Sequence, residues 1–317
     1  MTTLQRRRRR SLVAALALVI ALITSACGSS NPLGGGAISG DLKSIIVGSA
    51  DFPESKIIAE IYAQALEANG FTLSRQFGIG SRETYIPAVR DHSIDLIPEY
   101  TGTLLKYFDE KSAVTTPDAI ELALFRVLPG DLSILVPSPA EDKDSLAVTR
   151  ETANRWNLKT IADLAAHSPE VKLGAPSEFL NRTEGVPGLK KNYGLDITPN
   201  NFVAISDGGG PATVRALVDG TVTAANIFTT SPAIPENDLV ILEDPKNNFP
   251  AANVVPLVSS QKKSDELKTV LDAVSAKLTT EALIELNTAT SGNAGVDPDE
   301  AALKWVQENG FDKPLQG

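Results

Sequence analysis

The side chains that most often carry covalent or metal chemistry are scarce in this chain. It has one cysteine, Cys27, and two histidines, His92 and His167, in 317 residues. One cysteine excludes an intrachain disulfide and a cysteine-based zinc site, and two histidines are too few for a histidine-rich metal site. No Gly-x-Ser-x-Gly elbow occurs, and acidic pairs such as Asp207 with Asp219 have no catalytic context. We therefore expect a protein without a cofactor and without enzyme activity, with an enzyme as the alternative.

Composition and charge exclude further classes of protein. The chain is 42% apolar and 21% charged, as in an ordinary globular protein. Its net charge of −10 includes five arginines, Arg6 to Arg10, in a segment that we expect to be removed. Without that segment, 24 basic residues remain against 39 acidic ones, a net charge of −15. Nucleic-acid binding requires clustered Lys and Arg, so we expect no nucleic-acid partner.

The elements that must position a site alternate between short apolar strands and helical patterns. Residues 44–48 predict a buried strand, and residues 55–69 predict a helix with apolar side chains at helical spacing, ended by Gly70. Further strands are expected at 73–77, 94–97, 133–136, 145–149, 171–175, 202–205, 222–227, 239–242 and 253–258. Further helices are expected at 83–91, 119–128, 161–166, 188–192, 213–218, 264–278, 280–286 and 298–309, with another after residue 103. This alternation predicts an α/β fold with mainly parallel sheets, and the length favours two domains.

Ligands in such sheets bind beyond the carboxyl ends of strands. Four polar stretches follow expected strands, after Val47, Ile97, Val136 and Ala175. A binding site is therefore expected where these four stretches meet.

The first 42 residues predict an exported protein. After the arginines come 12 apolar residues, Leu12 to Ile23, too few for a comfortable membrane span. They fit a signal peptide over residues 1–26. Residues 23–27 resemble a bacterial lipobox, which implies cleavage before Cys27 and lipidation of its thiol; a plain signal peptide or a single anchor helix is the alternative. Residues 27–42, rich in Gly and Ser, predict a flexible tether. We expect an extracytoplasmic protein anchored by lipid to the outer face of the cytoplasmic membrane.

Five short segments carry a resemblance to a known family. They are Val47–Phe52, Asp95–Thr103, Asp144–Val148, Asn181–Leu189 and Asn248–Pro250. In this order they resemble the ProX/OpuC-type substrate-binding proteins of ABC importers for glycine betaine, choline and carnitine.

The resemblance implies a two-lobed type II periplasmic-binding-protein fold, with two crossover strands and a ligand cleft between the lobes. The first lobe would comprise residues 43–143 and 253–317, and the second residues 144–252. Crossings are expected near 141–144 and 251–253, with closure by hinge motion. The implied partners are a small solute, an ABC permease and its ATPase, and we expect a monomer.

The resemblance also assigns the site that holds the solute's acid group. A carboxylate needs fixed donors, ideally an arginine fork. Arg182 and Thr103 match the family's carboxylate ligands. Ala50, next to Asp51, stands where the family commonly has a lysine. We therefore expect Arg182, Thr103, Ala50 and Asp51 to contact the ligand. The site would have one positively charged side chain fewer than the sites of the family.

The quaternary ammonium group cannot donate a hydrogen bond, so its partner must be an aromatic face. Tyr100 and Phe228 match two cage positions of the family, whereas Leu146 and Ala252 stand at two further cage positions. Asp144 matches an acidic position at the cleft. Two lost cation–π contacts weaken binding by about 1–4 kcal/mol. The same scaffold binding a different solute, aromatic or another organic compound, and a receptor lipoprotein without transport therefore remain alternatives to osmoprotectant uptake.

Overall fold

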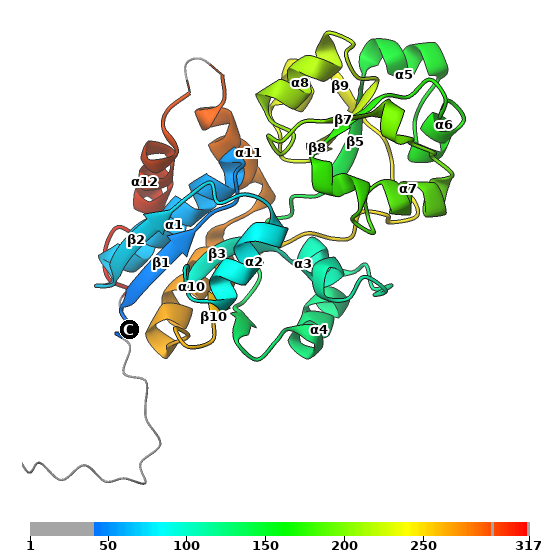
Figure 1. Cartoon of the computed structure of the whole chain (residues 1–317). Coiled ribbons are helices and arrows are strands. Elements are labelled where there is room, and N and C mark those ends of the chain that lie inside the picture. Colours follow the sequence, from blue (N-terminus) through cyan, green and yellow to red (C-terminus); the bar gives the residue numbers. More distant parts are fainter. Residues whose placement is uncertain (1–40, 293–294, 316–317) are drawn as a thin grey trace, which may run out of the picture. The chain divides into compact units, whose positions relative to one another are not determined.

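The computed structural model describes residues 41–292 and 295–315, which fold around two five-stranded sheets (Figure 1). Each sheet has its own helices and its own apolar clusters, so the chain forms two α/β lobes. The predicted signal peptide, Cys27 and most of the predicted tether lie outside the described residues. Within those residues, no helix has the length and apolar character needed to cross a membrane.

The first sheet has the strand order β2-β1-β3-β10-β4. β1 (Ser44–Gly48) is parallel to β2 (Thr72–Gln76) and β3 (Leu96–Tyr100), and β10 (Val254–Ser259) runs antiparallel between β3 and β4 (Leu132–Ile134). Because β1, β2 and β3 are parallel, the chain leaves all three at the same edge of the sheet. This edge faces the site described below.

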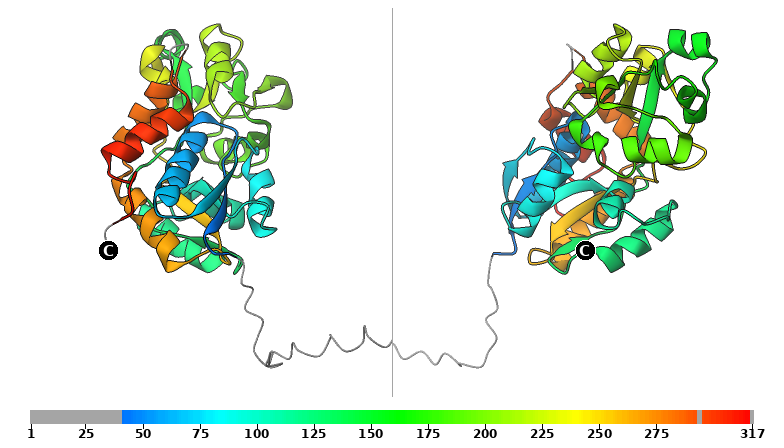
Figure 2. Two further views of the ribbon diagram at one scale, coloured as in Figure 1. Left: turned by 90° about the vertical axis from the view of Figure 1, so that its left-hand side faces the viewer. Right: turned by 45° about the vertical axis from the view of Figure 1, so that its right-hand side comes forward.

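The helices of the first lobe cover both faces of this sheet. They are α1 (Pro53–Ala68), α2 (Arg82–Arg90), α3 (Thr101–Phe108), α4 (Pro117–Val127), α10 (Asp265–Lys277), α11 (Thr280–Thr290) and α12 (Pro298–Glu308). The apolar periodicity of α1 buries Ile57, Ile61 and Leu66 in one cluster with Trp305 of α12. Figure 2 shows the blue α1 lying against the red α12, so the C-terminal segment completes the core of the first lobe.

The second sheet has the order β7-β6-β8-β5-β9. β6 (Leu173–Ala175) is parallel to β7 (Phe202–Ala204) and β8 (Ala224–Phe228), whereas β5 (Asp144–Thr149) runs antiparallel to β8 and β9 (Leu239–Ile241). Its helices are α5 (Arg150–Trp156), α6 (Ile161–Ala165), α7 (Val186–Tyr193), α8 (Pro211–Val218) and α9 (Ala233–Glu236), with 3-10 turns at η2 (Ser177–Leu180) and η3 (Pro199–Asn201).

Two connections carry the chain between the lobes, from β4 to β5 and from β9 to β10 (Figure 1). They meet in an isolated antiparallel bridge between Glu141 and Asn253. Both residues lie in the segments where the crossings were expected. The boundaries of the two lobes stay a prediction.

Both sheets are mixed rather than mainly parallel as predicted, because β10 and β5 run antiparallel to their neighbours. Among the local predictions that differ from the structure, two have a clear physical reason. Helix α5 was missed because RETANRW has too few apolar residues to show a helical period; the Thr149 side chain, which accepts from the Thr152 N–H, marks its start instead. Strand β3 runs to Tyr100, although Pro98 lacks an N–H. Pro98 faces Pro256 of β10. Opposed antiparallel residues exchange either both hydrogen bonds or none, and two prolines fit a pair that exchanges none.

Candidate functional site

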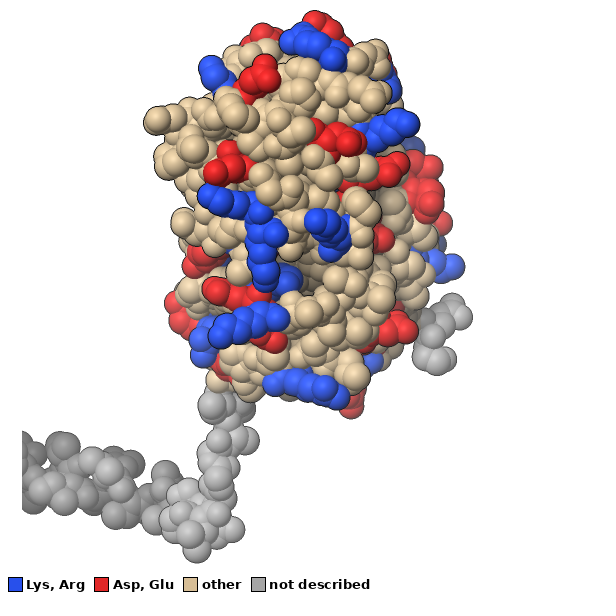
Figure 3. All heavy atoms as spheres, turned by 90° about the vertical axis from the view of Figure 1, so that its right-hand side faces the viewer, with Lys and Arg blue, Asp and Glu red and all other residues tan. Residues whose placement is uncertain are grey.

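A cavity of about 230 Å³ lies at the strand ends, and residues of both sheets line it. Eight of the nine predicted ligand residues are in its lining: Ala50, Asp51, Tyr100, Thr103, Asp144, Arg182, Phe228 and Ala252. Basic and acidic side chains are interspersed on the face of the molecule shown in Figure 3. The structure thus brings together segments that are distant in the sequence, while the binding roles of these residues remain proposals.

Leu146 is the ninth residue, and its predicted place at the ligand is wrong. Its side chain is fully buried in the apolar cluster of the second lobe, with Val148 and Leu173. Asp144 and Leu146 share a face of β5, but only the first residue of the strand reaches the cavity. From Leu146 onward, the apolar cluster of the second lobe covers this face of β5.

The junction of β3 and α3 forms one wall of the cavity. Tyr100 ends the strand and Thr101 begins the helix, so a buried strand delivers both residues to this edge. The Thr101 N–H donates to the Asn253 carbonyl at 3.0 Å, and Thr101 Oγ1 accepts from the Asn253 N–H at 3.1 Å. A Cβ on Gly102 would come within 2.2 Å of the Ala251 carbonyl oxygen. This segment therefore fastens the first lobe to the returning connection.

A buried ion pair lies beside this wall. Glu99, which is fully buried, accepts from Arg82 Nε at 2.7 Å and Nη2 at 2.9 Å. The Tyr85 hydroxyl and the Tyr100 N–H donate to the same carboxylate, each at 2.7 Å. Arg82 Nη2 also donates to Thr103 Oγ1 at 2.9 Å. Burial alone would lower the pKa of Arg82, but the charge of Glu99 holds it well above its ordinary value. Arg82 is therefore charged, and its hydrogen bonds to Glu99 fix its position.

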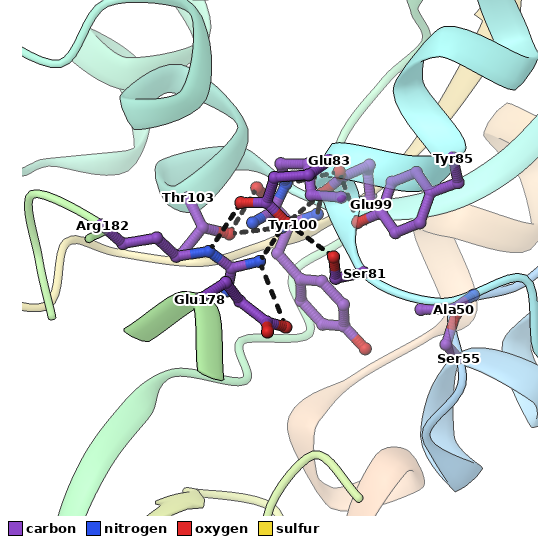
Figure 4. Close-up of polar contacts among 11 residues, drawn as sticks. Ala50, Ser55, Ser81, Glu83, Tyr85, Glu99, Tyr100, Thr103, Glu178 and Arg182 are labelled. Atoms are coloured by element: carbon purple, nitrogen blue, oxygen red, sulfur yellow. Dashed lines mark hydrogen bonds and ion pairs between the residues drawn. The ribbon is translucent and has the colours of Figure 1, made fainter. Parts of the chain in front are cut away.

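Arg182 faces the cavity from the second lobe, and its side chain is 22% exposed. Its Nε and Nη2 donate to the two oxygens of Glu83 on α2 at 3.1 and 3.0 Å, and Nη2 lies 3.8 Å from Glu178 (Figure 4). Burial alone would raise the pKa of Glu83, but hydrogen bonds and the charge of Arg182 lower it to about 2. Arg182 thus lies where the resemblance implied, but two carboxylates already neutralise it.

Aromatic rings form another part of the wall. The Phe52 ring lies 6.0 Å from the Tyr100 ring and 5.3 Å from the Phe228 ring, measured between centroids. Phe52 is the residue directly before α1, and Phe228 ends β8, so the two lobes both contribute rings. Tyr85 and Phe179 also line the cavity. The cavity therefore has more rings than the two that the resemblance assigned.

Carboxyl groups stand close to these rings. Asp142 and Asp144 line the cavity. Asp142 is buried and accepts from the Thr230 N–H at 3.0 Å. Burial, and then the nearby charge of Glu54, raise the pKa of Asp142 well above its ordinary value. Glu54 itself accepts from the Tyr100 hydroxyl at 2.7 Å and from Thr230 Oγ1 at 2.6 Å. This carboxylate therefore joins the hydroxyl of Tyr100 to the segment between β8 and α9 in the second lobe.

Four of the lining residues that the sequence prediction missed bear on the chemistry of the site: Phe52, Arg82, Tyr85 and Asp142. A signal existed for two of them. The prediction searched four strand ends and left out the end of β2, whose following stretch leads into α2 with Arg82 and Tyr85. Phe52 and Asp142 lie one or two residues from positions that were singled out, so only their side-chain directions were unknown.

A second cavity of about 750 Å³ adjoins the first. The two share Phe52, Asp142, Gly208 and Phe228 as lining residues, so the Phe52–Phe228 ring pair stands between them. The larger cavity extends to α8 and α9. In the described residues, no group of three or more His, Cys, Asp or Glu side chains could hold a metal ion.

Comparison with known proteins gives consistent matches. The model of a family described as the substrate binding domain of ABC-type glycine betaine transport systems matches residues 43–308. The chain is 26% identical over 278 residues to the glycine betaine-binding protein YehZ of Escherichia coli (strain K12), which covers 84% of this chain and 91% of that protein. It is 29% identical over 254 residues to the ergothioneine transport permease/ergothioneine binding protein EgtU of Helicobacter pylori (strain G27), covering 77% of this chain and 44% of that protein.

Solved structures share the fold. The crystal structure of a glycine betaine/carnitine/choline ABC transporter protein superposes with a TM-score of 0.65 at 23% identity, covering 85% of this chain and 100% of the other. The predicted two-lobed type II periplasmic-binding-protein fold is therefore confirmed.

Proposed function

The chain belongs to the family of substrate-binding domains of ABC-type glycine betaine transport systems, and from this premise we propose that its ligand is a small solute with a quaternary ammonium group and a carboxylate. The observation that carries the proposal is the row of rings formed by Phe52, Tyr100 and Phe228, beside Asp142. Ring faces attract a methylated cation. Arginine side chains on the same cavity offer donors to an acid group.

The size of the cavity supports a small ligand. Its volume of about 230 Å³ is below the roughly 300–1,000 Å³ of sites for drug-sized compounds. A compact betaine consists of little more than its methylated ammonium group and its acid group, so a small cavity can hold it. Ala50 and Ala252, which stand where the family has larger side chains, line this cavity together with Phe52 and Tyr85.

Family membership confirms that the chain is a binding protein of an ABC transporter rather than an enzyme. In our proposal, residues 43–143 with 253–317 close on residues 144–252 by rotation about the two connections. The closed protein, a monomer, delivers the solute to the permease, which the ATPase drives. Cys27 carries the lipid that keeps the protein at the outer face of the cytoplasmic membrane.

Calorimetric titration of residues 28–317 tests the ligand class. Glycine betaine, choline and carnitine are the ligands, and 3,3-dimethylbutanoate is the control because it replaces the ammonium nitrogen of glycine betaine by carbon. We expect one-to-one binding of at least one quaternary ammonium compound and markedly weaker binding of the control. Equal affinity for betaine and control, or binding of none of them, contradicts the proposal. Loss of solute uptake in a deletion strain is expected, whereas unchanged uptake favours a receptor without transport.

A larger betaine is the second candidate ligand. The adjoining cavity of about 750 Å³ supports it, because a solute with a ring beyond its ammonium carboxylate could extend past Phe52 and Phe228. EgtU is named for ergothioneine, which combines a trimethylammonium carboxylate with a heterocyclic ring. A thermal-shift comparison of ergothioneine with glycine betaine distinguishes the candidates, since the solute that fills the site better raises the melting temperature more.

A further inference from the structure

The two arginines at the cavity differ in how their charges are compensated. Arg182 lies against two carboxylates, those of Glu83 and Glu178. Among the described residues, Glu99 is the one carboxylate that forms an ion pair with Arg82, although the charge of Glu184 also acts on it. A solute's acid group that approached Arg182 would compete with both of its partners. The ion-pair partner of Arg82, Glu99, also accepts hydrogen bonds from other donors.

Glu99 divides its charge among several donors. Beside the two bonds from Arg82, it accepts from the Tyr85 hydroxyl and the Tyr100 N–H. Glu99 therefore neutralises the positive charge of Arg82 only in part, although its hydrogen bonds fix the position of the guanidinium. A rigid, incompletely compensated guanidinium is a preorganised site for an anion, because little side-chain freedom is lost when the anion binds.

One nitrogen of the Arg82 guanidinium makes no hydrogen bond to the described residues. Nε and Nη2 make all of its hydrogen bonds to residues of the described ranges, and Nη1 makes none. Nη1 is also absent from the buried polar atoms that lack a partner in this part of the chain, so it reaches solvent, although the residue is only 7% exposed. Arg82 lines this cavity and also a neighbouring one of about 290 Å³, which Glu184 lines as well, so the water at Nη1 belongs to one of these two cavities.

Two helix starts add to the positive potential at this place. Arg82 is the first residue of α2, and its partner Thr103 lies in the first turn of α3. Helix N-termini carry a partial positive charge that favours anions. At position 50, by contrast, the side chain is a methyl group and the N–H is bonded to Ser55 Oγ at 3.0 Å. The wall around Ala50 therefore offers no charge to an acid group.

We propose that Arg82 holds the carboxylate of the solute through its Nη1 edge, in place of a cation at position 50. Arg182 then acts as the contact between the lobes. Because Arg82 and Glu99 both lie on the first lobe, the solute's acid group binds before the lobes close. This inference rests on the proposed function, since it specifies which residue of that site recognises the acid.

The test compares glycine betaine with choline, which has the same trimethylammonium group but no carboxylate. Removing Arg82 alone would leave Glu99 buried and uncompensated, so the paired variant Arg82→Gln/Glu99→Gln is used. We expect its affinity for glycine betaine to fall about 10- to 100-fold, as for loss of a charged hydrogen bond, and its affinity for choline to stay within about threefold. Arg182→Gln is the matched comparison, and we expect it to weaken both ligands alike.

A second measurement does not depend on whether the double variant Arg82→Gln/Glu99→Gln folds. Acetate is titrated into the wild-type protein, and amide NMR shifts of Tyr85 and Thr103 are followed. We expect saturable shifts that persist in Arg182→Gln and disappear in Arg82→Lys, which keeps the charge but loses the fork.

The outcomes separate the two proposals. Equal losses for both ligands in the paired variant, or a betaine-selective loss in Arg182→Gln alone, overturn the role of Arg82 and leave the proposed function standing. If the wild-type protein binds neither ligand, the proposed function fails, and the acetate titration alone decides on Arg82. The absence of saturable shifts at Tyr85 and Thr103 overturns the inference.

Discussion

Arg182 of the second lobe and Glu83 of the first lobe form a two-point ion pair, with nitrogen–oxygen distances of 3.1 and 3.0 Å. The two residues are 99 positions apart in the chain. Arg182 lines the cavity. The contact therefore joins the two lobes beside the site.

Glu83→Gln should loosen this contact. Exposed ion pairs contribute about 0.2–1 kcal/mol, so we expect a modest shift towards open molecules, seen as a larger radius of gyration in X-ray scattering without ligand. Glu178→Gln is the control, because Glu178 lies farther from Arg182, at 3.8 Å. An unchanged radius in Glu83→Gln would show that the pair does not hold the lobes.

The Glu83 contact also sets a pH dependence. The pKa of Glu83 is lowered to about 2, below its unfolded value of about 4.3. A lowered carboxyl pKa gives stabilisation that is fully present above the unfolded value and is lost as the pH falls through the folded value. We therefore expect the opening of the wild-type protein to begin below about pH 4 and the Glu83→Gln variant to lack this step.

Asp142→Asn should stabilise the protein at higher pH. The pKa of buried Asp142 is raised, so the stability of the wild-type protein is greatest below the unfolded value of about 3.9 and falls as the pH rises through the folded value. Asparagine keeps the acceptor for the Thr230 N–H without the charge. We expect the melting temperature of the variant to exceed that of the wild type by more at pH 8 than at pH 5. The exposed Glu110→Gln is the control, and a constant difference across pH would contradict the interpretation.

Gly102→Ala should damage the junction of β3, α3 and the returning connection. Its Cβ would meet the Ala251 carbonyl oxygen at 2.2 Å, so backbone must move. Overpacking of this kind costs about 1–3 kcal/mol, which we expect as a melting temperature lowered by several degrees. Gly130→Ala is the matched control, because nothing lies within 4 Å of its Cβ position. Equal melting temperatures of the two variants would refute this steric explanation.

Phe52→Leu should weaken the ammonium site while keeping an apolar side chain. Loss of one cation–π contact, worth about 0.5–2 kcal/mol, predicts an affinity for glycine betaine lower by about 2- to 30-fold. Calorimetry with 3,3-dimethylbutanoate should show little change, because that compound has no cation. Phe125→Leu, at a residue 59% exposed on α4, is the control. Equal weakening of both compounds would mean that Phe52 acts through shape alone.

Cys27→Ser tests the proposed lipid anchor. The variant lacks the thiol that would carry the lipid, so we expect the protein to move from the membrane fraction to the soluble extracytoplasmic fraction. Ser30→Ala, in the same tether, should stay with the membrane. A Cys27→Ser protein that remains in the membrane fraction would favour an uncleaved N-terminal anchor helix.

The sequence by itself determined the type and order of most elements, the two α/β lobes and the strand ends at which a site forms. These features follow from apolar periodicity and from turn residues, which act over a few neighbouring positions. The predicted strand ends indicated the stretches that contain Tyr100, Thr103 and Arg182, and the family resemblance singled out these three residues.

Only the tertiary structure decided which side chains meet. It buried Leu146 in a core and left Asp144 at the cavity, although both share a strand face. It placed Phe52 against Phe228, and Arg82 against Glu99. The physical reason is that side-chain direction at a strand end, and the partners available to a buried charge, depend on segments brought together by packing rather than on neighbours in the chain.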